Sequence, residues 1–119
     1  IVDNKKYIYR KNFDKFLKLM KKGKVGPDSQ IDLHGHSLLE AKSKLKSFII
    51  DSYNNERRNL LVITGKGLNK TGLLKKEVPL WINENEIKNF IISCTSAPRS
   101  FGGEGALIIR IKNKNKASI

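Results

Sequence analysis

Short runs of β-forming residues alternate along this chain with longer amphipathic segments. Residues 31–34, 60–64, 90–95 and 106–112 read as strands, because they alternate apolar with polar residues or form short apolar runs. Helices of the length found between them imply crossover connections, whereas the short loop before the last strand implies an antiparallel partner. The sequence therefore predicts an α/β fold of βαβαββ order, a four-stranded mixed sheet with two crossover helices.

The first predicted helix carries the clearest local signal. Ser37, followed three residues later by Glu40, forms a capping box that begins the helix. The residues that make its apolar stripe are Leu38, Ala41, Leu45, Phe48 and Ile49. A similar stripe predicts the second helix over 74–82, where Pro79 is tolerated at little cost only near the first turn. The start of that second helix is therefore open by several residues.

The length of 119 residues suits one domain with a modest core. The chain does not begin with methionine, and we expect it to be a fragment of a longer protein. No run approaches the roughly 18 apolar residues of a membrane span, and no signal peptide is recognisable, so we expect a cytoplasmic protein. The single cysteine, Cys94, excludes an internal disulfide or a CxxC zinc site, and its apolar surroundings indicate a buried thiol.

The chain is strongly basic. Twenty-four Lys and Arg against eleven Asp and Glu give a formal charge of +13, which favours a polyanionic partner such as nucleic acid or an anionic membrane surface. The chain is also rich in Lys, Asn and Ile together, as expected for an AT-rich genome. That compositional bias raises the lysine content without any selection for binding, so charge alone leaves both explanations open.

Much of the excess charge lies near the N-terminus, where residues 1–30 hold nine basic and three acidic side chains. After Asn12, which can serve as N-cap, apolar residues recur at helical spacing: Phe13, Phe16, Leu17 and Met20. The segment KKGKVGPDSQ, residues 21–30, then reads as a linker, because its glycines and its proline break any helix. We expect a basic N-terminal helical arm over 1–30, one domain over 31–112 and a frayed Lys-rich tail over 113–119.

The stretch IDLHGH, residues 31–36, places Asp32 and His34 on one face at a strand end. A carboxylate beside an imidazole can set its tautomer and raise its basicity, and such a pair can take a proton from water or from a ribose 2′-hydroxyl. In the alternative, Asp32 hydrogen-bonds loop backbone and His34 caps the turn. The residues alone leave both open, and His36 reads as a surface turn residue.

Two glycine-rich loops could bring backbone N–H groups and cations to an anion. One is TGKG, with Gly65, Lys66 and Gly67, which lacks the Walker A sequence because leucines follow Gly72. The other is GGEGA, with Gly102, Gly103 and Gly105, near which Arg99 could contact phosphate. Both could equally be simple glycine turns.

No group of acidic, His or Cys residues has metal-ligand spacing, which disfavours a two-metal nuclease. IDLHGH and TGKG both lie at the carboxyl ends of predicted parallel strands, where ligands bind in such sheets, so we expect them to converge.

The succession IDLHG, TGKG, VPLW and GGEGA, in this order within eighty residues, resembles the Smr (small MutS-related) domain family over residues 31 to about 112. The resemblance implies a fold similar to the C-terminal domain of translation initiation factor three. It also implies nucleic-acid binding and endonuclease activity, described in the family as nicking of DNA and as cleavage of RNA, including messenger RNA on stalled or collided ribosomes.

The family's acidic and histidine pair falls on Asp32 and His34, and its basic loop on residues 65–67. Its third motif falls on Gly102, Gly103 and Gly105. Many standalone members have a histidine just before the paired glycines, where this chain has Phe101. The resemblance thus implies an endonuclease in DNA repair or in ribosome-linked quality control.

For phosphodiester cleavage, we expect His34 to act as general base or acid and Asp32 to orient it, while Lys66 and the loop N–H groups stabilise negative charge. RNA is the first choice of substrate and DNA the second; the ribosome is a further candidate partner, and a membrane is not. A loosely held Mg²⁺ or Mn²⁺ stays open. The alternative is a non-catalytic nucleic-acid-binding module, and the sequence does not indicate an oligomeric state.

Overall fold

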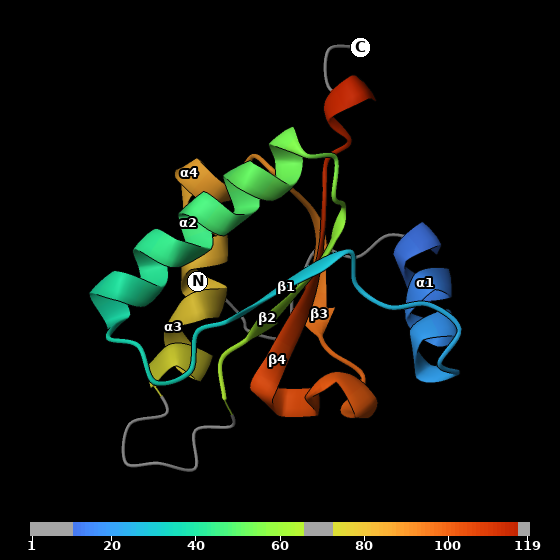
Figure 1. The fold of residues 1–119 in the computed structure, drawn as a ribbon, viewed down its shortest axis with the longest axis horizontal. Helices are drawn as coiled ribbons and strands as arrows, with labels where there is room; N and C mark the ends of the chain where they lie inside the picture. Colours follow the sequence, from blue (N-terminus) through green and yellow to red (C-terminus); the bar gives the residue numbers. More distant parts are fainter. Residues whose placement is uncertain (1–10, 66–72, 117–119) are drawn as a thin grey trace.

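The computed structural model describes residues 11–65 and 73–116, and a four-stranded mixed sheet lies at its centre (Figure 1). The strands, in spatial order, are β1 (Ser29–Asp32), β2 (Asn59–Ile63), β4 (Ala106–Ile111) and β3 (Ile91–Ser96). β1 runs parallel to β2, whereas β4 is antiparallel to both of its neighbours. The predicted α/β fold with a mixed four-stranded sheet is confirmed.

Helices provide the predicted crossovers. α2 (Leu38–Asn54) joins the parallel strands, and it begins with the predicted capping box, in which Ser37 and Glu40 each accept from the other's backbone N–H. α3 (Leu73–Ile82) follows β2. A short α4 (Asn85–Lys88), which the sequence pattern did not indicate, completes the connection to β3.

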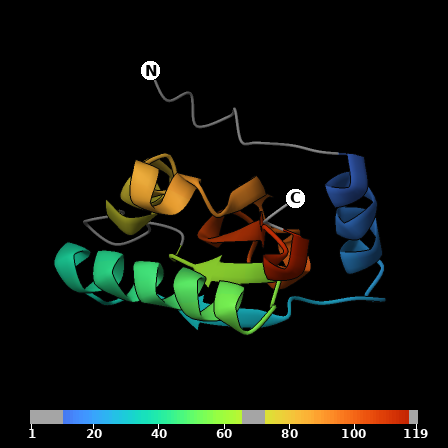
Figure 2. The same ribbon diagram turned by 90° about the horizontal axis from the view of Figure 1, so that it is seen from above.

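The sheet is covered on both faces. Figures 1 and 2 show α2, α3 and α4 on one side of the sheet, while α1 (Lys11–Lys21) lies on the other. The alternation of β4 explains how one strand serves both layers: Leu107 and Ile109 pack in the cluster with α2 and α3, whereas Ile108 packs against α1. The protein is thus a three-layer arrangement with a core on each side of the sheet.

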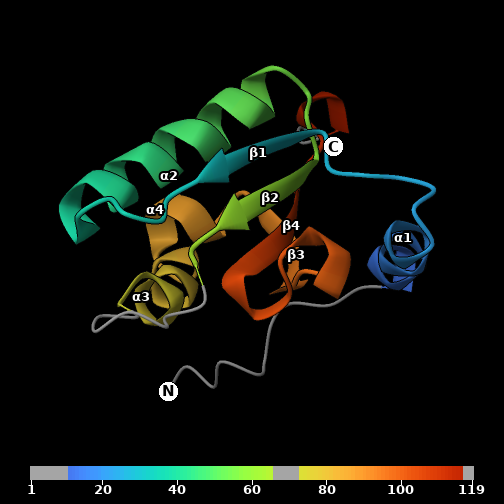
Figure 3. The same cartoon turned by 60° about the horizontal axis from the view of Figure 1, so that its bottom comes forward.

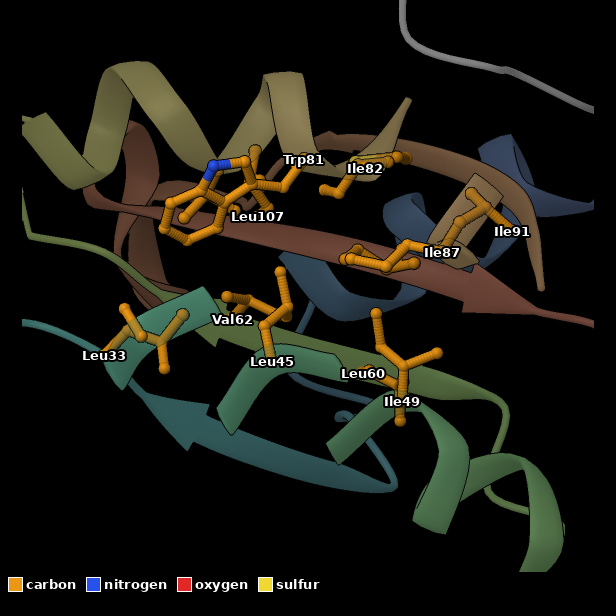
Figure 4. Packing of buried hydrophobic residues seen from close by; sticks show 14 of the residues in the cluster. Leu33, Leu45, Ile49, Leu60, Val62, Trp81, Ile82, Ile87, Ile91 and Leu107 are labelled. Atoms are coloured by element: carbon orange, nitrogen blue, oxygen red, sulfur yellow. The ribbon is translucent and has the colours of Figure 1, made fainter. Parts of the chain in front are cut away.

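The larger core lies between the sheet and the crossover helices (Figure 4). Its buried residues come from β2, β3, β4, α2, α3 and α4 and from Leu33 directly after β1, while Ile31 of β1 packs against them partly buried. Those labelled in Figure 4 are Leu33, Leu45, Ile49, Leu60, Val62, Trp81, Ile82, Ile87, Ile91 and Leu107. Cys94 belongs to this cluster, and burial raises the pKa of its thiol. The predicted buried, unreactive thiol agrees with this position.

The smaller core fastens the N-terminal helix to the sheet. Phe13 and Met20 are completely buried against Ile108. The Arg110 guanidinium lies 5.7 Å from the Phe13 ring centroid and 5.2 Å from that of Phe16, and its Nε donates to Asn59 Oδ1 at 2.9 Å. Burial lowers the pKa of Arg110, and the Arg58 charge adds to that effect. Cation–π contact therefore adds to apolar packing at this interface.

Two local expectations were wrong, and the structure shows where Pro79 lies in α3, which the sequence left open. Asn12 is the second residue of α1 and lies inside the helix, so it is not the N-cap. Pro79 is the seventh residue of α3, not part of its first turn; its buried ring offsets part of the cost of the missing N–H, and Asn83 Nδ2 donates to the Pro79 carbonyl. Ser29 begins β1 two residues before the predicted strand, because Gln30 and Ile31 pair with β2 at Leu61 and Val62.

Truncation of Phe13 should destabilise the whole domain. Phe13→Ala removes a fully buried ring and a stacking partner of Arg110, and is expected to lower the free energy of unfolding by roughly 3–5 kcal/mol. Urea unfolding followed by the fluorescence of Trp81, the only tryptophan, measures this effect on the opposite face of the sheet. Leu39→Ala is the matched control, because Leu39 is 85% exposed and should change little. Equal midpoints for Phe13→Ala and the unaltered chain would contradict cooperative packing of α1.

Candidate active site

The parallel pairing of β1 and β2 brings two predicted loops together. Asp32 pairs with Ile63 at the last position of the register, and the Leu33 N–H continues the ladder by donating to the Ile63 carbonyl at 2.8 Å. In Figure 3 the arrowheads of the two strands end side by side. A Cβ built on Gly65 would lie 3.5 Å from the Cβ of His34. IDLHGH and the start of TGKG therefore converge as expected.

Asp32 and His34 form a direct pair at this strand end. Asp32 Oδ1 lies 2.8 Å from His34 Nδ1 and also accepts the His34 backbone N–H at 3.0 Å. The ring contact favours the tautomer in which Nδ1 carries the proton and Nε2 carries the lone pair. The His34 side chain is 67% exposed, so Nε2 is accessible from solvent. Such an imidazole can accept a proton from a bound substrate.

The pair sits on a turn and not on the strand itself. β1 ends at Asp32, Leu33 is completely buried, and the His36 N–H closes the turn onto the Leu33 carbonyl at 3.2 Å. Gly35 supplies the positive φ of +84° that the turn requires. The sequence allowed Asp32 to contact either the loop backbone or the His34 imidazole. In the structure one carboxylate oxygen contacts both.

The environment of Asp32 favours its ionised form. Partial burial works against the charge, but the hydrogen bonds from the His34 side chain and backbone N–H outweigh it, and the pKa of Asp32 lies below the usual value of 3.8. The carboxylate is therefore charged throughout the physiological range. It can orient His34 and stabilise the imidazolium that forms when His34 takes a proton.

The GGEGA loop supports the same site from the far side of β2. It folds as two 3₁₀ turns, Arg99–Phe101 and Gly103–Gly105. The Gly105 carbonyl accepts the N–H groups of Thr64 and Gly65 at 2.8 and 3.0 Å, and the Thr64 hydroxyl at 3.3 Å. The loop thereby holds the residues that follow β2 in place beside His34.

The glycine N–H groups do not match the predicted phosphate site. Gly65 donates to Gly105, Gly102 to Arg99, Gly103 to Pro98 and Gly105 to Gly102, all at 2.9–3.2 Å. A phosphate would have to break these bonds to reach the same N–H groups. Gly102 instead allows close approach of the backbone to β4: it has φ +117°, and a Cβ there would lie 2.9 Å from the Ala106 Cβ.

The remaining predicted site residues lie either near this strand end or outside the residues that the structure describes. Lys66 and Gly67 lie outside the described residues. Arg99 is exposed at the start of the first 3₁₀ turn. Phe101 is partly buried and packs against the α1 cluster and against the cluster of Leu61, Ala97 and Ala106. Its ring has no titratable group, so it cannot transfer a proton. A pair that the sequence did not indicate, Lys75 to Glu104 at 2.9 Å, joins α3 to the GGEGA loop; only the fold brings these distant positions together.

Within residues 11–65 and 73–116, no group of three or more His, Cys, Asp or Glu side chains could hold a metal ion. The same ranges contain no helix of the length and hydropathy that crossing a membrane requires.

The fold and the strand-end site together define the class. The sheet is mixed, and its parallel strands β1 and β2 end at the same edge. β1 leads into the turn that holds the Asp32–His34 pair, and the residues after β2 are held by the GGEGA loop. The Smr domain family model matches residues 31–112, and the chain belongs to this family. The predicted family is confirmed.

Curated relatives carry the name ribosome rescue factor SmrB. The protein from Buchnera aphidicola subsp. Schizaphis graminum is 32% identical over 106 residues, which cover 89% of this chain and 57% of that protein. The protein from Shewanella sp. (strain ANA-3) is 34% identical over 96 residues, covering 80% and 51%. The chain therefore spans about half the length of the curated relatives that it matches.

Two solved structures share the fold. YdaL, a stand-alone small MutS-related protein from Escherichia coli, matches with a TM-score of 0.69 at 20% identity over 95% of this chain and 88% of that one. The Smr domain of Thermus thermophilus MutS2 matches with a TM-score of 0.62 at 20% identity over 71% and 98%. The match to YdaL extends beyond the family domain of this chain.

The Asp32–His34 contact can be tested by titration. Carbon-detected NMR should give Asp32 a pKa below 3.8, and His34→Ala should raise it, because the side-chain hydrogen bond is lost while the backbone one remains. Since the folded pKa is depressed, the pairing contributes stability above the unfolded pKa and loses it as pH falls through the folded value. His36→Ala should shift Asp32 much less, because His36 acts only through its charge at longer range. An Asp32 pKa unchanged by His34→Ala would refute the contact.

The glycine loop offers a matched pair of substitutions. Gly102→Ala should unfold or strongly destabilise the domain, because the added Cβ would meet Ala106 at 2.9 Å in a left-handed conformation. Gly103→Ala should cost only about 1–2 kcal/mol, the penalty for a left-handed alanine, since no atom lies within 4 Å of its Cβ. Thermal unfolding of both variants measures the difference, and equal losses would contradict the close approach at Gly102.

Proposed function

We propose that this Smr domain is an endonuclease that cleaves RNA, with His34 as the proton acceptor and Asp32 as the residue that orients it. The observation that carries the proposal is the 2.8 Å contact between His34 Nδ1 and the Asp32 carboxylate, which leaves an accessible Nε2 at the strand end. A ring held by one nitrogen and exposed at the other is arranged for general base catalysis.

The proposed reaction uses the substrate's own nucleophile. His34 Nε2 takes the proton of a ribose 2′-hydroxyl, the 2′-oxygen bonds to phosphorus, and the bond from phosphorus to the 5′-oxygen breaks. The departing 5′-oxygen takes a proton from a general acid or from water, so the products are a 2′,3′-cyclic phosphate and a 5′-hydroxyl. Asp32 stabilises the imidazolium that His34 becomes, and Lys66, which directly follows Gly65, is proposed to neutralise charge on the phosphorane-like transition state.

Two further observations support nucleic acid as the substrate. The formal charge of +13 suits a polyanion. Arg99 is exposed on the loop that holds Gly65 in place, and we propose that it contacts a phosphate. RNA is preferred to DNA because only RNA supplies the 2′-hydroxyl that this Asp–His pair can activate. DNA nicking, in repair or recombination, is the second choice.

The relatives named ribosome rescue factor suggest where such cleavage takes place. We propose that this domain acts in the cytoplasm on messenger RNA at the ribosome. The ribosome is then the partner that delivers the substrate.

The second candidate is a nucleic-acid-binding module without catalysis. It is favoured by the bond from the His34 backbone N–H to Asp32, which is the contact a purely structural carboxylate would make. In that case basic side chains bind backbone phosphates, affinity falls steeply with salt, and no product forms.

A cleavage assay separates the two candidates. The chain should cut labelled single-stranded RNA, and replacing the ribose 2′-hydroxyl at the cut position by hydrogen should abolish cutting. Asp32→Asn and His34→Ala should lower the cleavage rate by about 10²- to 10⁴-fold while leaving RNA affinity within about twofold, because the pair handles protons and the cations bind phosphate. Gel analysis gives the rate and fluorescence anisotropy the affinity.

Supercoiled DNA and EDTA form the control arms of that assay. Undiminished cutting of DNA would refute the role of the 2′-hydroxyl, and loss of RNA cutting in EDTA would assign part of the chemistry to Mg²⁺ or Mn²⁺. Binding of RNA without turnover, unaffected by Asp32→Asn and His34→Ala, would establish the binding module.

A further inference from the structure

Cleavage of a phosphodiester by an internal hydroxyl requires two proton transfers. One proton leaves the nucleophile, and another must reach the departing 5′-oxygen, which is a poor leaving group as an alkoxide. His34 and Asp32 together supply only the acceptor for the first transfer. The attacking and leaving oxygens lie roughly in line on opposite sides of phosphorus. Efficient cleavage therefore calls for a second proton-transfer group near His34, outside the Asp32–His34 pair.

Among residues 11–65 and 73–116, which the structure describes, few side chains can fill that place. The chain has two histidines, and the second is His36. The only thiol, Cys94, is buried in the core. Among the described residues near the glycine loop, Lys75 is paired with Glu104, and Phe101 has no titratable group. His36 is the remaining imidazole, and imidazole is the side chain that ordinarily exchanges protons near neutral pH.

The turn places His36 beside the Asp–His pair. Its N–H bonds to the Leu33 carbonyl at 3.2 Å, and only Gly35 separates it from His34 in the chain, so the two Cα atoms are at most about 7 Å apart. The charge of His36 is among those that lower the pKa of Asp32, after burial and the bonds to His34, which also indicates proximity. The His36 side chain is 34% exposed, so solvent and substrate can reach it.

A carboxylate accompanies His36, as one accompanies His34. Glu40 Oε1 lies 3.9 Å from His36 Nδ1, where it is a counter-ion for the protonated ring. The same oxygen accepts the Ser37 N–H and hydroxyl at 3.3 and 3.2 Å, so the α2 capping box holds it in position. The short turn between β1 and α2 thus carries two imidazole–carboxylate pairs, one contacting the strand end and one the helix cap.

We propose that His36 is the general acid that protonates the 5′-oxygen leaving group, with Glu40 as its positioning residue. The inference rests on the RNA cleavage proposed above. His34 gains the proton of the 2′-hydroxyl while the 2′-oxygen bonds to phosphorus; the bond from phosphorus to the 5′-oxygen breaks, and that oxygen takes the proton of the His36 imidazolium. The pair of rings ends in the opposite protonation states, which exchange with water restores.

Sulfur substitution of the leaving group tests this assignment. The cut bond is first mapped with the unaltered chain, and the same RNA is then made with sulfur in place of the bridging 5′-oxygen at that bond. A thiolate leaves without protonation, so a missing general acid no longer matters. His36→Asn should cut ordinary RNA about 10²- to 10⁴-fold more slowly and the sulfur substrate within about threefold of the unaltered chain.

Two further variants make the result specific. His34→Ala should be slow on both substrates, because sulfur does not replace the base. Glu40→Gln keeps an oxygen that accepts from Ser37 and so keeps the capping box. It should slow ordinary RNA by about tenfold or less and recover on the sulfur substrate, as a positioning residue would. Rapid cutting of the sulfur substrate by His36→Asn also demonstrates that this variant is folded.

The outcomes distinguish the inference from the proposed function. If His36→Asn cuts ordinary RNA at the unaltered rate, or is equally slow on both substrates, His36 is not the general acid, whereas the loss of activity in His34→Ala still supports the nuclease. If the unaltered chain binds RNA and cuts neither substrate, the proposed function and the inference are both overturned.

Discussion

The parallel pairing of β1 with β2 is the interaction on which the rest of the structure depends. Parallel strands need a crossover, and α2 supplies it by packing its apolar stripe over the sheet. The same pairing ends both strands at one edge, where Leu33 extends the ladder to Ile63 and is completely buried. Ser37 begins α2 only five residues after Asp32. The turn between them is held at both ends, which gives His34 a defined position.

A second constraint is that β4 is covered on both faces of the sheet. Ile108 and Arg110 face α1, while their neighbours face the crossover helices. α1 therefore contributes apolar packing to the domain in addition to its charged side chains. Stacking of the flat Arg110 guanidinium on Phe13 and Phe16 keeps a cation at a partly buried position.

Local patterns predicted local features of this fold well. The capping box at Ser37 and Glu40 and the four strands depend on short-range spacing, and they are present as expected. The expectation that Asp32 and His34 point the same way is met for a different reason, since β1 ends at Asp32 and their contact comes from the turn. Contacts between distant residues, such as Lys75 with Glu104, left no sequence signal because only the folded sheet brings them together.

The hydrogen bonds of the glycine loops limit which groups at this site are available to bind a phosphate. The glycine residues were expected to offer N–H groups, but Gly65 and the three glycines of 102–105 donate theirs to protein carbonyls. Leaving those carbonyls unpaired would cost about 1–3 kcal/mol each if they stay buried. Positive side chains can approach a phosphate without breaking any of these bonds. Recognition at this edge should therefore come from Lys and Arg side chains on a rigid glycine scaffold, and binding should weaken strongly as salt increases.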